Sequence, residues 1–214
     1  MAAQEKKIAG IILAAGSGVR MDKTKQLLLF KNKPLLSHVI KNARQSNFYE
    51  TVVVLGHCAD EIKKTINFSG TKTIINSEYL KGQSTSLIKG LANISPVCDA
   101  AMFLLGDQPL ITPSTLNTII QAFNTSKSPI AIHYYNNTRG NPVIIAKSLF
   151  NELKLLSCDT GPRILFKKFQ KSILKVPIAD NAVLFDVDTK ADYKELISTG
   201  CYKTPISPIS KLEK

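Results

Sequence analysis

A glycine-containing turn with two cationic side chains is the part of this sequence best suited to chemistry. It spans 13–21, with the sequence LAAGSGVRM, follows the apolar run 8–12, and is followed by Lys25. Small residues let the backbone turn tightly and approach a ligand, and amide N–H groups in such a turn can bind an anion. Arg20 offers a fork of donors and Lys25 a mobile point charge, which together suit a polyphosphate. The pattern predicts a nucleotide-binding loop.

This loop differs from the two commoner phosphate-binding loops. A Walker A loop needs a Gly-Lys pair followed by serine or threonine, and no such triplet follows Gly16 or Gly18. A dinucleotide-binding fingerprint needs a third glycine three residues after the second, where this chain has Met21. The sequence therefore predicts a phosphate loop of another kind.

Carboxylates that could hold a metal ion follow apolar runs at two places. Asp107 comes just after the run 100–105, so we expect it at the exit of a buried strand. Asp186 and Asp188 alternate along another expected strand and would point to one face, although Asp188 or Thr189 could instead cap the helix that follows. A triphosphate arrives with Mg²⁺, which binds one or two carboxylates.

The phosphate loop resembles the signature of the MobA-like nucleotidyltransferases, Leu-Ala-Ala-Gly-x-Ser-x-Arg-Met-Gly-x-x-Lys. It departs from that signature at Gly18, where the family has serine, and at Asp22, where the family has glycine. The resemblance implies that Arg20 holds the β- and γ-phosphates and that Lys25 stabilises charge at the α-phosphate. It also implies a fold like that of the nucleotide-diphospho-sugar transferases.

Two further segments are similar to the metal motifs of this family. Leu-Gly-Asp-x-Pro is matched at 105–109, and Asp-x-Asp-Thr-x-x-Asp-Tyr is matched at 186–193. The resemblance implies that Asp107 and Asp188 bind Mg²⁺, with Mn²⁺ as an alternative metal and Asp186 as an alternative to Asp188. Asp107 thereby joins Arg20 and Lys25 as the residues expected to be catalytic.

A polar, glycine-broken segment, 76–87, runs into a predicted helix whose N-terminal N–H groups could bind a base or a phosphate. Ser84 could equally be a simple N-cap of that helix. In relatives, the similar Gly-x-x-x-Ser-Leu region helps to hold the base and the ribose. The residues that we assign to the nucleotide are Leu13, Ala14, Ala15, Gly16, Ser17, Gly18, Arg20, Lys25, Asn76, Gly82, Gln83 and Ser84.

Two segments in the second half resemble motifs of the molybdopterin cytidylyltransferases. The segment 139–143, RGNPV, is similar to Arg-Gly-His-Pro-Val, with Asn141 in place of histidine. The segment 158–163, CDTGPR, is similar to Gly-Asp-x-Gly-Ala-Arg, with Cys158 and Pro162 as departures. Two arginine forks could bind the phosphate of a second substrate, although each could instead form a surface ion pair. The residues that the resemblance assigns to this substrate are Arg139, Asn141, Asp159 and Arg163.

The reaction implied by the resemblance joins CMP from CTP to the phosphate of molybdopterin, or of the molybdenum cofactor, and releases pyrophosphate. An apo-molybdoenzyme or its maturation chaperone would be a protein partner. One alternative is a nucleotidyltransferase that acts on a sugar phosphate or a polyol phosphate. Another is a cofactor-delivery protein for a molybdoenzyme. A glycosyltransferase would typically carry an isolated Asp-x-Asp in mid-chain instead of a cationic Ala-Ala-Gly loop.

Charge and composition exclude other classes of protein. The chain has 214 residues, 44% of them hydrophobic, and a formal net charge of +12. Lysines are spread along it and far outnumber arginines, and no basic block is interleaved with aromatic residues, so we do not expect nucleic-acid binding. The positive balance can help to steer an anionic substrate.

The chain is expected to be cytoplasmic, with no membrane contact, because it shows no signal peptide and no apolar run of 18 residues. Its cysteines are scattered without a Cys-x-x-Cys pair or a cluster with histidine, which argues against structural zinc and redox pairing. We expect buried, reduced thiols at all four cysteines, which are Cys58, Cys98, Cys158 and Cys201.

Apolar strand-like runs alternate with amphipathic helical runs, which predicts an α/β fold. We expect a Rossmann-like, mostly parallel central sheet with helices on both faces and small antiparallel additions at an edge. The expected strands are 8–14, 51–56, 72–75 and 100–105, then 129–134, 142–146 and 173–176. The expected helices are 35–46, 59–66, 84–92, 113–123 and 189–198. The prediction is a single nucleotidyltransferase domain, 1–202, followed by a disordered tail, 203–214.

Overall fold

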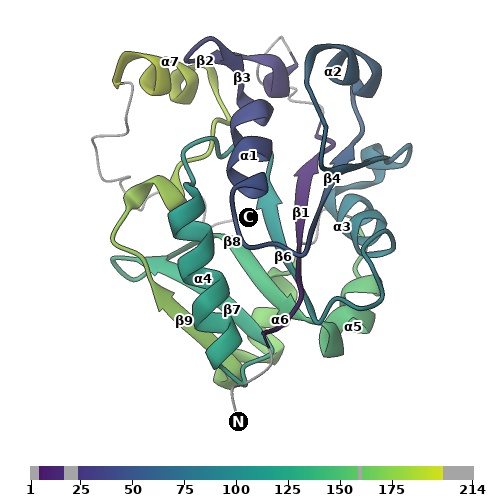
Figure 1. Ribbon diagram of the computed structural model, residues 1–214, viewed down its shortest axis with the longest axis vertical. Coiled ribbons are helices and arrows are strands. Elements are labelled where there is room, and N and C mark those ends of the chain that lie inside the picture. Colours follow the sequence, from purple (N-terminus) through teal and green to yellow (C-terminus); the bar gives the residue numbers. More distant parts are fainter. Residues whose placement is uncertain (1–4, 17–23, 159–160, 200–214) are drawn as a thin grey trace.

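The computed structural model describes residues 5–16, 24–158 and 161–199. In this part of the chain the main sheet has the strand order β5-β4-β1-β6-β8-β7-β9 (Figure 1). Its strands are β1 (Ile8–Ala14), β4 (Glu50–Leu55), β5 (Lys72–Ile75), β6 (Ala100–Leu105), β7 (Ile130–Tyr135), β8 (Thr138–Ala146) and β9 (Ile173–Pro177). A separate antiparallel hairpin joins β2 (Leu29–Phe30) to β3 (Lys33–Pro34). The predicted α/β fold is confirmed.

The direction of the edge strands corrects one expectation. β4, β1 and β6 are parallel neighbours, as predicted, and β8 then runs antiparallel to β6. β7 is antiparallel to β8 but β9 is parallel to β7, so β8 alone among the strands of this sheet opposes the others. The antiparallel addition is therefore one strand, not three. Short strands can pair in either direction, and their order in the sequence does not determine which one they adopt.

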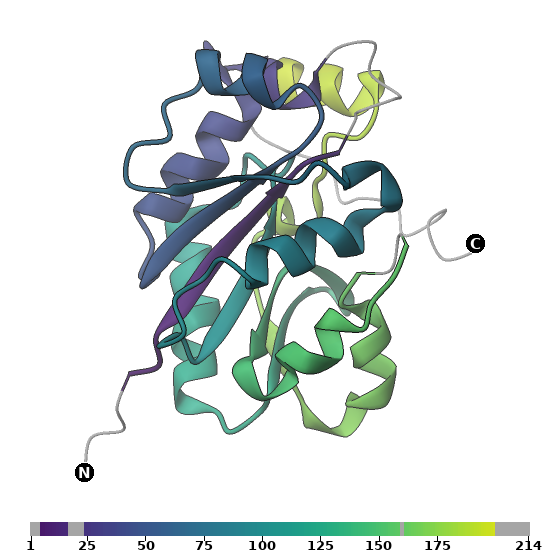
Figure 2. The same ribbon diagram turned by 90° about the vertical axis from the view of Figure 1, so that its right-hand side faces the viewer.

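Helices cover both faces of the sheet (Figure 2). They are α1 (Leu35–Arg44), α2 (Ala59–Thr65), α3 (Gln83–Leu91), α4 (Pro113–Thr125), α5 (Phe150–Lys154), α6 (Arg163–Lys168) and α7 (Lys190–Thr199). Thr112 caps α4 by accepting a hydrogen bond from the Thr115 amide, and Pro113 takes the first helical position. The short helices α5 and α6 were not predicted, because five or six residues show too little periodicity to be recognised.

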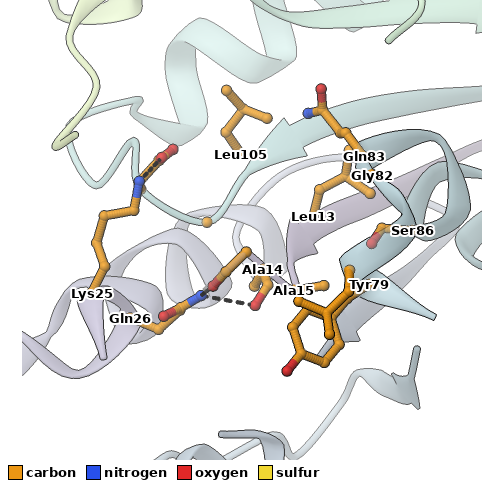
Figure 3. Close-up of a pocket in the computed structure, with 14 residues that line it drawn as sticks. Leu13, Ala14, Ala15, Lys25, Gln26, Tyr79, Gly82, Gln83, Ser86 and Leu105 are labelled. Atoms are coloured by element: carbon orange, nitrogen blue, oxygen red, sulfur yellow. Dashed lines mark hydrogen bonds and ion pairs between the residues drawn. The ribbon is translucent and has the colours of Figure 1, made fainter. Parts of the chain in front are cut away.

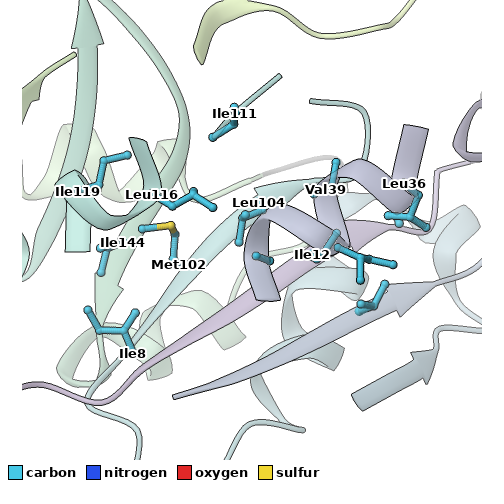
Figure 4. Packing of buried hydrophobic residues seen from close by; sticks show 14 of the residues in the cluster. Ile8, Ile12, Leu36, Val39, Met102, Leu104, Ile111, Leu116, Ile119 and Ile144 are labelled. Carbon is cyan, nitrogen blue, oxygen red and sulfur yellow. The ribbon is translucent and has the colours of Figure 1, made fainter. Parts of the chain in front are cut away.

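The side chains of β1 point alternately to the two faces of the sheet, so they contribute to two hydrophobic clusters. Ile8 and Ile12 pack with α1 and α4 on one face, where Leu36, Val39, Leu116 and Ile119 also lie (Figure 4). Ile11 points to the other face and packs with Leu87 of α3 and with residues of α5 and α6. Both faces are covered, so the central strands are apolar throughout and not only at alternate positions.

A third, smaller hydrophobic cluster ties the C-terminal segment to the start of the chain. Phe185, Val187 and Leu196 of that segment pack on Phe30 and Leu35. The Val187 amide also donates a hydrogen bond to the Asp107 carbonyl, 3.1 Å away. This cluster places the segment before α7 beside the carboxyl ends of β1 and β6.

Cysteine placement departs from expectation. Cys98 is buried, but Cys58 is half-buried and Cys158 is exposed, and all three are free thiols. Cys158 lies in a loop with a positive φ, where no strand or helix covers it. Cys201, the boundary at 202 and the tail 203–214 lie outside the described residues. Within the described ranges, no helix is long and apolar enough to cross a membrane.

Phe123 tests the packing of α4 on the sheet. It is 1% exposed and belongs to the core cluster on the α1–α4 face. We expect Phe123→Ala to lower the free energy of unfolding by about 3–5 kcal/mol, because it removes a buried ring and leaves a cavity. Leu155→Ala is the control, since Leu155 is 81% exposed and its loss should change stability by less than about 0.5 kcal/mol. Equal effects in denaturant titrations would contradict this packing.

Candidate functional site

A cavity of about 420 Å³ opens at the carboxyl ends of β1 and β6 (Figure 3). This is the edge of a parallel sheet at which ligands of α/β proteins bind. Its walls come from the end of β1, the short helix that carries Lys25, the turn before α3, and the exit of β6. The lining residues are Leu13, Ala14, Ala15, Gly16, Lys25, Gln26, Tyr79, Leu80, Gly82, Gln83, Ser86, Leu105, Gly106 and Asp107.

An ion pair network lies at one side of this cavity. The Lys25 Nζ is 2.5 Å from Asp107 Oδ2 and 3.1 Å from Asp188 Oδ1. The three side chains are 15%, 17% and 29% exposed, so water screens the network only in part. Burial disfavours the charged amine, but the attraction of Asp107 and then of Asp188 outweighs it and raises the pKa of Lys25. Lys25 is therefore a cation at neutral pH.

Asp188 and Asp186 lie in different surroundings. The expected strand over this segment is wrong, because 185–189 has no regular structure and its side chains do not share a face. Asp188 reaches Lys25, whereas Asp186 accepts a hydrogen bond from the Gln108 amide at 2.6 Å. Thr189 caps α7 by accepting a hydrogen bond from the Asp192 amide, which leaves the Asp188 carboxylate at the network.

The Asp107 and Asp188 carboxylates fit a divalent metal. Asp107 Oδ1 is buried and has no hydrogen-bond partner among the described residues, a costly arrangement that a cation would relieve. Oxygen ligands suit Mg²⁺ and Mn²⁺, and Mg²⁺ often takes one or two carboxylates together with substrate phosphates and water. No cluster of three or more metal-binding side chains occurs in the described part of the chain.

The predicted nucleotide residues fall into three groups. Leu13, Ala14, Ala15, Gly16, Lys25, Gly82 and Gln83 line the cavity. Ser17, Gly18 and Arg20 lie outside the described residues. Asn76 and Ser84 are buried in the wall behind the cavity: the Asn76 amide bonds Thr85 and Ser86, and Ser84 donates to the Cys158 carbonyl at 2.7 Å. These two side chains hold the start of α3, and a direct contact with nucleotide remains a prediction for both.

Several lining residues were not predicted. Tyr79, Leu80 and Ser86 flank the predicted residues Gly82 and Gln83, and the short helical turn 79–81 brings the first two to the rim. Gln26 follows Lys25 and is 4% exposed, with hydrogen bonds to the phosphate loop. No sequence signal marked Gln26, because its burial and its bonds to the loop carbonyls arise only in the fold. No periodicity marks the turn at 79–81.

The residues predicted for a second substrate lie beside the cavity and do not line it. The Arg139 guanidinium lies 4.9 Å from the centre of the Phe166 ring. Partial burial, and then the positive charge of Arg163, lower the pKa of Arg139. Neither forms a salt bridge with a carboxylate within the described ranges. Asn141 is half-buried on β8, and Asp159 lies outside the described residues.

Comparisons with known proteins bear on this arrangement. Residues 10–173 match the model of the MobA-like NTP transferase domain. The chain belongs to this family. It has the nucleotide-diphospho-sugar transferase fold, and the family match spans the phosphate loop, Lys25 and Asp107.

Relatives of known structure cover most of the chain. Rv0371c from Mycobacterium tuberculosis H37Rv is 28% identical, with a TM-score of 0.82 over 91% of this chain and 100% of that one. That protein is also known as a complex with manganese. Its homologue from Mycobacterium sp. strain JC1 is 30% identical, with a TM-score of 0.80 over 90% and 96% of the two chains.

A curated relative is matched over a shorter stretch. The bifunctional protein GlmU of Alkaliphilus metalliredigens is 37% identical over 116 residues, which are 53% of this chain. The chain spans 25% of the length of that relative. The similarity thus concerns one part of GlmU.

His133 lies against Gly140, next to Arg139, and makes the stability of the fold depend on pH. Its Nδ1 is 3.0 Å from the Pro142 carbonyl, and a side chain on Gly140 would come within 2.3 Å of its Nε2. Burial lowers the pKa of His133 to about 4, so the imidazole is neutral at pH 7. Because the folded chain keeps His133 neutral, acid favours the unfolded chain, in which the imidazole takes up a proton more readily.

Acid should therefore weaken the protein through His133. The unfolded chain binds a proton near pH 6.5 and the folded chain only near pH 4, so stability is complete above pH 6.5 and is lost as the pH falls toward 4. Between pH 7 and pH 4 we expect the wild type to lose about 3 kcal/mol more than His133→Gln, measured by urea unfolding. Parallel curves for the two proteins would show that His133 is not buried as a neutral side chain.

Proposed function

We propose that this protein is a nucleotidyltransferase that joins CMP from CTP to the phosphate of molybdopterin or the molybdenum cofactor, with release of pyrophosphate. The observation that carries this proposal is the Lys25–Asp107–Asp188 network beside a cavity lined by the phosphate loop. A cation and two carboxylates at one sheet edge suit a metal-bound triphosphate. The choice of CTP and molybdopterin rests on the resemblance of the segments 139–143 and 158–163.

The reaction would proceed by positioning and charge neutralisation. An oxygen of the acceptor phosphate attacks the α-phosphorus, and the bond from that phosphorus to the bridging oxygen of the β-phosphate breaks, so pyrophosphate leaves with the electron pair. Lys25 would stabilise charge at the α-phosphate, and Arg20 with the loop would hold the β- and γ-phosphates. A divalent metal held by Asp107 and Asp188 would neutralise charge on the phosphates.

No general base is needed, since a phosphate monoester is already ionised near neutral pH. The histidines fit this expectation. His133 is fully buried, His38 bonds the Phe30 carbonyl at 2.7 Å, and the ring of His57 contacts the Tyr79 hydroxyl at 3.4 Å. None of them lines the cavity.

The acceptor phosphate would bind at Arg139 and Arg163. Neither guanidinium has a carboxylate partner among the described residues, the charge of Arg163 disfavours that of Arg139, and an anion bound by both would remove this repulsion. The loop that leads into Arg163, the first residue of α6, reaches the nucleotide cavity, because Gly161 lies against Gln83. The acceptor would therefore lie next to the nucleotide.

A second candidate acceptor is a sugar phosphate or a polyol phosphate. The arginine pair recognises a phosphate group and not the pterin ring, and Asn141 stands where the cytidylyltransferase motif has histidine. Any phosphate monoester could use the same two forks. The choice of acceptor therefore needs a direct assay.

Removing a charge from the network tests the catalytic proposal. We expect Lys25→Ala and Asp107→Ala each to lower turnover by at least about 10²-fold, because each loses an electrostatic contact to the reacting phosphates or their metal. Lys72→Ala is the control, since Lys72 is exposed and its Nζ donates to the Asn93 carbonyl. Pyrophosphate release near the wild-type rate from either network variant, with the fold intact, would refute these roles.

Substrate choice is tested by measuring pyrophosphate release with Mg²⁺ from CTP, GTP, ATP and UTP, each with and without molybdopterin. We expect release from CTP only when molybdopterin is present, since the acceptor supplies the attacking oxygen. Release with a sugar phosphate or polyol phosphate instead, and none with molybdopterin, would favour the second candidate. A preference for another nucleotide would refute the assignment of CTP.

A further inference from the structure

The described start of the phosphate loop, 13–16, is held from behind by one buried side chain. Gln26 is 4% exposed, and its Nε2 donates hydrogen bonds to the Ala14 and Gly16 carbonyls, each 3.0 Å away (Figure 3). The family signature ends at the lysine matched by Lys25 and does not include Gln26. It lies on the short helix Lys25–Leu27, so it follows directly after the lysine of the ion network.

Exposed carbonyl oxygens weaken the binding of a polyphosphate to a loop. An oxygen with free lone pairs repels a phosphate, whereas an N–H group attracts it. The Leu13 carbonyl accepts from the Gly106 amide and the Ala15 carbonyl from the His57 amide, at 2.9 and 3.2 Å. Backbone amides thus occupy two of the four carbonyls in 13–16, and Gln26 supplies the donors for the other two.

The two bonds of Gln26 also set the orientation of the loop. In a trans peptide the C=O and N–H groups point in opposite directions, so holding the Ala14 carbonyl also holds the direction of the Ala15 amide. A backbone donor could satisfy only one carbonyl, but the NH₂ group of a side-chain amide has two hydrogens and can bridge both.

The same residue couples the loop to the catalytic cation. Lys25 and Gln26 are adjacent in a three-residue helix, so a movement of the loop relative to Lys25 would break the Gln26 bonds. Lys25 in turn is fixed by Asp107 and Asp188. The start of the loop, the cation and the two carboxylates are therefore linked by hydrogen bonds and ion pairs.

We propose that Gln26 is a positioning residue for triphosphate binding: by donating to the Ala14 and Gly16 carbonyls it presents the phosphate loop to the nucleotide in a fixed register with Lys25. This inference rests on the proposed function, because it assumes that the cavity receives a nucleoside triphosphate. It adds a residue that acts through the loop.

The test compares the binding of CTP and of inorganic tripolyphosphate, each with Mg²⁺, by calorimetry. Gln26→Glu keeps the size of the side chain but places an ionised carboxylate against two carbonyl oxygens, and Gln26→Met removes both donors. We expect each variant to weaken both ligands by at least about tenfold and by the same factor, because the loss concerns the phosphate loop and not the base.

Asn42→Leu is the matched control. The Asn42 amide also donates to two backbone carbonyls, those of Pro109 and Ile111, at 3.4 and 2.8 Å, but it does not line the cavity. It should lower the unfolding midpoint as Gln26→Met does, and leave the affinity for tripolyphosphate unchanged. Stability and phosphate binding are thereby separated.

Three outcomes would count against the inference. Wild-type affinity for both ligands in folded Gln26→Glu and Gln26→Met would overturn it while leaving the proposed function intact. Loss of CTP binding without loss of tripolyphosphate binding would also overturn it, since Gln26 would then act on the base or the ribose. A wild-type protein that binds neither ligand would instead refute the nucleotide site itself, and the inference with it.

Discussion

The structure depends on an ion network that joins three distant parts of the chain. Lys25 follows the phosphate loop, Asp107 follows β6, and Asp188 precedes α7. The partly buried Lys25 cation holds the two carboxylates together. Without Lys25 the two negative charges would repel each other in a partly desolvated place. The network therefore draws the C-terminal segment onto the sheet edge, and the small cluster around Phe30, Phe185 and Leu196 fixes it there.

The same constraint explains how one edge of the sheet gathers opposite charges. Parallel neighbours β4, β1 and β6 bring their carboxyl ends together, so the loops that follow them share one side of the molecule. Lys25 comes from the connection after β1, and the carboxylates come from the exit of β6 and from the segment before α7. Both signs of charge are needed where a metal-bound polyphosphate is handled, because the phosphates need cations and the metal needs anions.

The antiparallel strand β8 connects β6, the last of the central parallel strands, to β7 and β9. It brings Arg139 next to β7, with the guanidinium over the Phe166 ring, and the loop before α6 leads to Arg163, whose positive charge acts on Arg139. Ser84 bonds the Cys158 carbonyl, so this loop is also attached to the start of α3 beside the nucleotide cavity. The proposed triphosphate site and the proposed site for the acceptor phosphate thereby lie side by side, as a transfer between two phosphates would require.

The sequence by itself determined the α/β class, nearly every long strand and helix, and the phosphate loop, because hydrophobic periodicity and local motifs are properties of neighbouring residues. It could not choose between Asp186 and Asp188, since a predicted strand would have put both on one face. Tertiary packing separates the two side chains: the segment is irregular, Asp188 contacts Lys25, and Asp186 contacts Gln108. The parallel pairing of β9 and the role of Gln26 were likewise hidden, because each depends on contacts between residues that the sequence places apart.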